Sequence, residues 1–116
     1  MTWEEVLQRS DLVGGELETQ EDGCIYRGPI GKIELKDGYL HITSPWVARL
    51  DPSSGSGWKK WENNPFFVDA KLATPRDIGE GRIHFNVLGL GHATIFPAGG
   101  SKLDPVRVEG LSLTNT

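Results

Sequence analysis

One stretch of the sequence, residues 82–97, constrains the fold more than any other. Apolar side chains occupy every second position from Ile83 to Val87, and the polar residues His84 and Asn86 lie between them. A glycine-rich turn and a second short apolar run follow. Alternation with a period of two is typical of a strand that buries one face and leaves the other polar, so this stretch predicts a β-hairpin.

Short runs with the same strand character recur along the chain, and no helical pattern separates them. The Asp37-Gly38 pair is the strongest hairpin signal among them, because Asp-Gly readily adopts the positive φ angles of a type I′ turn. Pro45 interrupts a long strand pattern and predicts a bend, a bulge or an edge position there. With the hairpin strands at 82–88 and 92–97, the predicted strands lie at residues 16–20, 23–28, 31–36, 39–44, 46–50, 58–62, 66–72 and 106–109.

One helix is predicted, at residues 3–13. Thr2 and Glu5 have the spacing of a capping box, and acidic residues in the first turn suit the positive end of the helix dipole. Apolar residues recur at helical spacing from Trp3 onward, with Val13 as the last of them, and a Gly-Gly pair ends the pattern. A helix this short needs packing against another element to be stable.

The strand pattern predicts an all-β fold in a single domain that spans residues 1–116. We expect a small antiparallel β-barrel of about eight or nine short strands with the N-terminal helix packed on it, and a two-sheet sandwich is the alternative. Either arrangement hides strand edges, and glycine-rich strands bend readily enough to favour closure. Residues 51–57 and 74–80 are expected to be surface loops, the first of them flexible, and the tail at 112–116 is expected to fray.

Charge and cysteine content narrow the classes of protein to consider. The net charge is −4, and the first 23 residues hold seven acidic residues and one basic residue, which disfavours binding to nucleic acid or to an anionic membrane. A single cysteine, Cys24, allows no internal disulfide and favours a reducing compartment. The sequence has neither the apolar run of a signal peptide nor that of a membrane span, so we expect a cytoplasmic protein.

Two histidines of the predicted hairpin define the first candidate site. If residues 89–91 make a three-residue loop, Asn86 pairs with Thr94 and the polar residues of both strands share one face. A loop of even length would instead place His92 on the apolar face. Two imidazoles supply too few ligands for a metal site. The plainer interpretation is that both histidines face solvent on the outside of a sheet, and the functional one is that this face is pH-sensitive or contacts a ligand. Its residues are His84, Asn86, His92 and Thr94.

The second candidate site follows the 51–57 loop. Two tryptophans flank two lysines there, and such aromatic and basic surfaces bind other molecules through stacking and cation–π contacts. The plainer interpretation is that a tryptophan packs in the core while the lysine stems cover its edge. The residues of this site are Trp58, Lys59, Lys60 and Trp61.

No pattern of nucleophile, base or phosphate-binding loop predicts catalysis. Cys24 has no base near it in the sequence and no serine lies in a nucleophile elbow, so no catalytic residue, metal or cofactor is assigned. We therefore expect a non-catalytic binding or accessory module that contacts a protein or a small molecule through the surface around Trp58 and Trp61. The alternatives are a β-barrel that binds a small ligand in an internal cavity and a small enzyme that uses His84 and His92. The sequence leaves the oligomeric state open.

Overall fold

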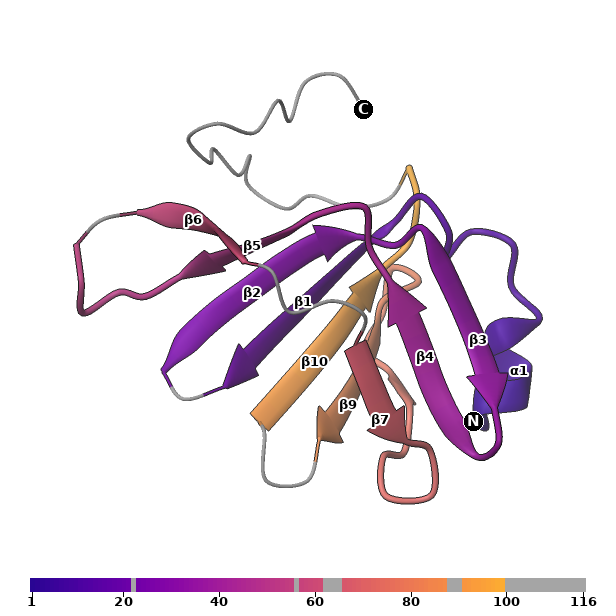
Figure 1. Cartoon of the computed structure of the whole chain (residues 1–116). Helices are drawn as coiled ribbons and strands as arrows, with labels where there is room; N and C mark the ends of the chain where they lie inside the picture. Colours follow the sequence, from indigo (N-terminus) through magenta and orange to yellow (C-terminus); the bar gives the residue numbers. More distant parts are fainter. Residues whose placement is uncertain (22, 56, 62–65, 88–90, 100–116) are drawn as a thin grey trace.

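Antiparallel strands form most of the regular secondary structure of the computed structural model, which describes residues 1–21, 23–55, 57–61, 66–87 and 91–99 (Figure 1). The elements are α1 (Trp3–Leu7), β1 (Glu16–Glu21), β2 (Cys24–Pro29), β3 (Lys32–Lys36), β4 (Tyr39–Thr43), β5 (Val47–Leu50), β6 (Trp58–Trp61), β7 (Phe66–Asp69), β8 (Arg76–Asp77), β9 (Ile83–Val87) and β10 (Gly91–Phe96). A seven-stranded sheet has the order β6-β5-β2-β1-β10-β9-β8, and a three-stranded sheet has the order β3-β4-β7. The fold is thus mostly β, with one short N-terminal helix among the described residues.

Two long strands run through both sheets and join them: β2 continues as β3, and β4 continues as β5. Lys32 of β3 pairs with Thr43 of β4. Arg27 lies five residues before Lys32 and pairs with Ala48 of β5, which lies five residues beyond Thr43. β7 pairs with β4 and β6 pairs with β5 at one constant offset, and residues 62–65 between them lie outside the described residues. β2, β5 and β6 thus belong to the larger sheet, and β3, β4 and β7 belong to the smaller one (Figure 1).

The two sheets meet where these long strands bend. Pro45 lies between β4 and β5, so the bend predicted there is confirmed. Beside it, the N–H group of Gly31 donates to the carbonyl of Thr43, with 2.8 Å between nitrogen and oxygen. At this bend the backbones approach closely at Gly28, where a Cβ atom would lie 2.5 Å from the carbonyl oxygen of Trp46. Strands that switch sheets through such bends form the corner between two packed sheets.

One hydrophobic core lies between the two sheets and the helix. Trp3 of α1 packs edge-to-face on Phe85 of β9, with ring centroids 4.9 Å apart. The Trp3 indole also donates from Nε1 to the carbonyl oxygen of Ala73 over 2.7 Å. Full burial of a large apolar side chain contributes about 1.5–3 kcal/mol, so this shared core accounts for the association of the two sheets. Its buried residues are Trp3, Val6, Leu12, Leu17, Ile30, Leu40, Ile42, Ala73, Ile83, Phe85, Val87, Ala93 and Ile95.

The helix has the predicted start but not the predicted length. The Thr2 hydroxyl accepts a hydrogen bond from the N–H of Glu5, and the Glu5 carboxylate accepts one from the N–H of Thr2, so the capping box is confirmed. The helix ends at Leu7 instead of Val13. The following turn directs Leu12, which is 1% exposed, into the core and leaves Val13 53% exposed. Burial of Leu12 therefore overrides the helical spacing of the sequence.

The described strands do not close into the predicted barrel. β6 and β8 are the two ends of the seven-stranded sheet, and two sheets over one core take the place of a closed ring. Closure depends on which strand edges meet, and the pattern of a single strand does not encode this. The type I′ turn is confirmed by φ angles of 55° at Asp37 and 81° at Gly38 and by the pairing of Lys36 with Tyr39.

The predicted loops and the tail have different outcomes. Residues 51–57, of which 56 lies outside the described residues, connect β5 to β6, and the Asp51 carboxylate accepts hydrogen bonds from the Ser53 N–H and hydroxyl at 3.0 and 2.7 Å. The stretch 74–80 contains the unpredicted strand β8. The predicted strand at 106–109 and the tail lie outside the described part of the chain. No helix among the described residues has the apolar length that spanning a membrane requires.

The close approach at Gly28 can be tested by substitution. Gly28→Ala would force a methyl group against the Trp46 carbonyl and should lower the free energy of unfolding by about 2–3 kcal/mol. Gly31→Ala is the matched control, since its Cβ atom would lie 3.3 Å from the Thr43 carbonyl, and it should cost less than about 1 kcal/mol. Urea unfolding measures both variants, and equal losses would contradict this geometry of the bend.

Candidate functional site

The β9–β10 hairpin has a loop of odd length, so its polar residues share one face. His92 pairs with Asn86, and Thr94 pairs with His84. The shared face is therefore confirmed, whereas the expected pairing of Asn86 with Thr94 is wrong. The three residues between the paired strands are 88–90, one position earlier than expected, and they lie outside the described residues. The observed partner of each residue therefore lies two positions along the strand from the expected partner. A shift of two positions keeps every side chain on the same face, so the faces are as predicted.

One row of cross-strand neighbours extends across all seven strands of the larger sheet on this face. Directly opposed residues of antiparallel strands project to the same side, so the pairings place the whole row on one side of the sheet, where Ala48 is buried. We call this side of the sheet the polar face. From β8 to β6 the row is Arg76, His84, Thr94, Glu18, Arg27, Ala48 and Lys60.

Two imidazoles lie side by side toward the β8 end of the polar face. The ring centroids of His84 and His92 are 5.4 Å apart, and the ring planes are inclined by 32°. Arg76 Nη2 lies 3.0 Å from His84 Nδ1. Asn86 Oδ1 lies 2.9 Å from His92 Nδ1. We call these four residues the imidazole cluster.

The neighbours of the two rings determine where each ring carries its proton. A guanidinium only donates, so His84 Nδ1 accepts from Arg76 and the neutral ring carries its proton on Nε2. An amide oxygen only accepts, so His92 donates from Nδ1 to Asn86. Neither of these partners is a carboxylate, the group that commonly orients a catalytic histidine.

The surroundings of His84 make its protonation unfavourable. Partial burial lowers the pKa of the imidazole from its ordinary value of 6.5, and the positive charges of Arg76 and of protonated His92 lower it further. An electropositive group therefore faces His84 from each of the two neighbouring strands, β8 and β10.

The β6 end of the polar face carries an aromatic ring against a guanidinium. Arg27 Cζ lies 5.5 Å from the centroid of the Trp58 ring, which is within the range of a cation–π contact. Lys60 projects to the same face, and Lys59 projects to the opposite one because side chains alternate along a strand. The predicted surface is thus divided between the two sides of the sheet. The Trp61 side chain lies outside the described residues.

An acidic residue separates the two ends of the polar face. Glu18 Oε2 lies 3.9 Å from Arg27 Nε, and the two side chains are only 17% and 11% exposed. Next to them on β1, burial raises the pKa of the Glu16 carboxyl, and the nearby Arg27 charge opposes this shift. Arg27 therefore has both an aromatic neighbour and an acidic one.

Sequence reasoning missed both arginines of the polar face. Arg27 occupies an outward position of a predicted strand, so its face could have been inferred from alternation, but its neighbours depend on which strands pair. Arg76 belongs to a two-residue strand inside a predicted loop, and two residues are too few to show a period.

Cys24 lies on the side of the sheet opposite the polar face, and its contacts there hold strands together. Cys24 is buried, and its sulfur accepts from Arg49 Nη2 at 3.1 Å. Arg49 also donates from Nε to the Tyr26 hydroxyl at 3.2 Å. These contacts join β2 to β5 on the side opposite the polar face.

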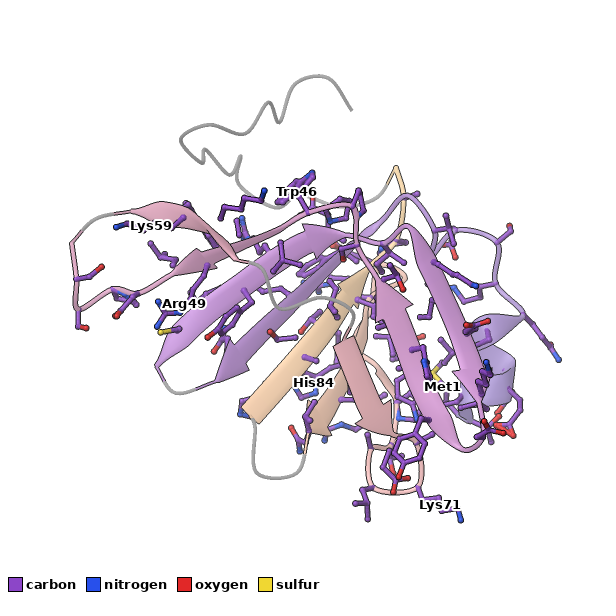
Figure 2. All side chains as sticks on the ribbon, in the orientation of Figure 1. Met1, Trp46, Arg49, Lys59, Lys71 and His84 are labelled. Atoms are coloured by element: carbon purple, nitrogen blue, oxygen red, sulfur yellow. The ribbon has the colours of Figure 1, made fainter. Side chains whose placement is uncertain are left out.

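Distance separates the two candidate sites. Five strand spacings lie between β9 and β6, which amounts to about 24 Å at the usual separation of neighbouring strands. Figure 2 shows His84 and Lys59 on well-separated parts of the sheet. A small molecule would contact one site only. Across the described ranges, no three His, Cys, Asp or Glu side chains are grouped closely enough to hold a metal ion.

Comparisons with known proteins identify no relative, so the function has to be inferred from the geometry of the site. No protein-family model matches the chain, and neither a curated protein nor a solved structure matches it.

Removing the Arg76 charge should raise the pKa of His84. The pKa of His84 is lowered in the folded state, so the unfolded chain takes up a proton at His84 before the folded chain does as the pH falls below about 6.5. Acidification therefore favours the unfolded state and lowers the free energy of unfolding. Arg76→Gln should reduce this loss. Titration of the imidazole resonances by NMR measures the change, with His41 as an internal reference. An unchanged or lower His84 pKa in the variant would contradict the assigned contact.

Proposed function

We propose that the chain is a non-catalytic binding module that recognises an acidic polypeptide segment at the β6 end of the polar face. The observation that carries this proposal is the Trp58 ring held against Arg27 beside Lys60. Aromatic and arginine side chains with ordered neighbours are the groups that contribute most to protein interfaces. We propose further that the protein acts in the cytoplasm, whose reducing conditions suit a chain with a single cysteine.

Charge supports an acidic partner. The adjacent strands β2, β5 and β6 contain four basic residues and no acidic residue. Arg27 and Lys60 project to the polar face, and Arg49 and Lys59 project to the opposite one. Glu18 lies 3.9 Å from Arg27, and Asp51 lies 3.9 Å from Arg49. The excess of positive charge favours acidic groups, which it would also steer toward this end of the sheet.

The core argues for a surface site rather than an internal one. Apolar side chains of both sheets and α1 fill the space that a ligand-binding barrel would leave for its ligand. We infer a two-sheet sandwich for the complete domain, since strands of both sheets contribute to this core. The enzyme alternative has less support, because Arg76 and Asn86, rather than carboxylates, hold the two imidazoles.

A labelled acidic peptide tests this function. We expect a short fluorescein-labelled peptide of alternating Glu and Val to bind with an affinity that falls as salt is added. Trp58→Ala should weaken binding about tenfold or more, because truncating an aromatic anchor costs more than about 1.4 kcal/mol. Lys60→Glu should weaken it through repulsion while leaving the aromatic ring in place. Fluorescence anisotropy measures each affinity.

Lys71→Gln provides the control, because this exposed lysine lies outside β2, β5 and β6. Circular dichroism of each variant separates lost binding from lost folding. The proposal fails if Trp58→Ala and Lys71→Gln bind alike. It also fails if a peptide of alternating Lys and Val, or a single-stranded DNA oligomer, binds as tightly as the acidic peptide.

A further inference from the structure

We propose a second binding site on the polar face, in which Arg76, His84 and His92 take the phosphate group of a ligand. The centre of this site, on β9, lies about five strand spacings, or about 24 Å, from β6, which carries Trp58. The nearest strands of the two sites, β10 and β2, are two spacings apart, and the sites share no residue. Three adjacent strands, β8, β9 and β10, each contribute one of its three groups. This proposal can therefore be tested independently of the proposed acidic-peptide site.

The hydrogen bonds of the imidazole cluster leave donors for such a ligand. Arg76 uses Nη2 toward His84 Nδ1, and a guanidinium has further N–H groups on its planar fork. The neutral His84 ring carries its remaining proton on Nε2, as its acceptor role at Nδ1 requires. His92 already donates from Nδ1, so protonation would create a second donor at Nε2. No contact among the described residues uses either Nε2 atom.

A phosphate group suits this set of donors better than a carboxylate. Its several oxygens can each accept from a group on a different strand, whereas a carboxylate offers only two oxygens. The Thr94 hydroxyl, paired across from His84, adds a donor of the kind that phosphate oxygens accept.

The groups that face the imidazoles show an unbalanced positive charge. β8 contributes Arg76, and β9 and β10 contribute the two histidines. β1, on the other side of β10, places Glu18 opposite Thr94 and the neutral Gln20 opposite His92. Glu18 is directed toward Arg27, at 3.9 Å. No carboxylate of the described residues contacts the three groups, so an arriving anion would relieve repulsion that the fold leaves in place.

This arrangement makes the site sensitive to pH. Partial burial, Arg76 and His92 all lower the pKa of His84. A bound phosphate would favour the protonated imidazole of His84 and raise its pKa. By linkage, phosphate should bind more tightly as the pH falls through the range in which His84 takes up a proton.

Inorganic phosphate is the probe for the test. The imidazole nitrogen resonances of the whole chain are followed by NMR during phosphate titration at about pH 5.5 and about pH 8, with sodium chloride at matched ionic strength as the reference. We expect saturable shifts of His84 and His92 and a dissociation constant at least about fivefold smaller at the lower pH. Shifts that match those in sodium chloride, or tighter binding at the higher pH, would overturn the proposal.

Variants assign the site to its residues. Arg76→Gln and His92→Gln should each weaken phosphate binding about tenfold, whereas Lys36→Gln, which removes an exposed charge from β3, should leave it unchanged. Equal binding by Arg76→Gln and Lys36→Gln would overturn the assignment. A phosphoserine peptide in place of inorganic phosphate distinguishes the source of the group: tighter binding of the peptide indicates a phosphorylated polypeptide, and equal binding indicates phosphate itself.

Discussion

A single pairing register through two bent strands, β2–β3 and β4–β5, underlies the rest of the structure. The ladders β2–β5 and β3–β4 keep one offset, and the ladders β5–β6 and β4–β7 keep another, although the chain changes sheets between them. A slip of one residue would turn the apolar side chains away from the core. Gly28 and Pro45 allow the strands to bend without losing this register. Because the strands bend, the sheets enclose one core, in which Trp3 packs on Phe85.

Strand pairing also decides which polar side chains can act together. It aligns a row of residues from Arg76 at one end of the larger sheet to Lys60 at the other. The near-neutral pair of Glu18 and Arg27 lies within this row and divides it electrostatically. Two separate surfaces result, one built on imidazoles and one on an aromatic ring, and we propose a different kind of anionic ligand for each. The proposed binding at the surface agrees with a core that is built of apolar side chains.

Local patterns in the sequence predicted the elements, and long-range pairing determined how they combine. Strand positions, the type I′ turn at Asp37 and the bend at Pro45 follow from neighbouring residues alone. The length of the helix does not follow from neighbouring residues alone, because the burial of Leu12 ends the helix earlier than the helical spacing of the sequence indicates. The separation of Lys59 from Lys60 follows from strand alternation. The position of Arg76 beside His84 does not follow from strand alternation, because β8 is recognisable only through its pairing with β9.

Backbone nuclear Overhauser effects across the long strands test the central claim most directly. If one register continues through the bend, the strongest cross-strand effects should connect Arg27 with Ala48 on one side of the bend and Lys32 with Thr43 on the other. Strongest effects between Arg27 and Val47 or Arg49, with the Lys32 pairing unchanged, would show that the register breaks at the bend. That result would contradict the continuous strands and the row of side chains that defines the polar face.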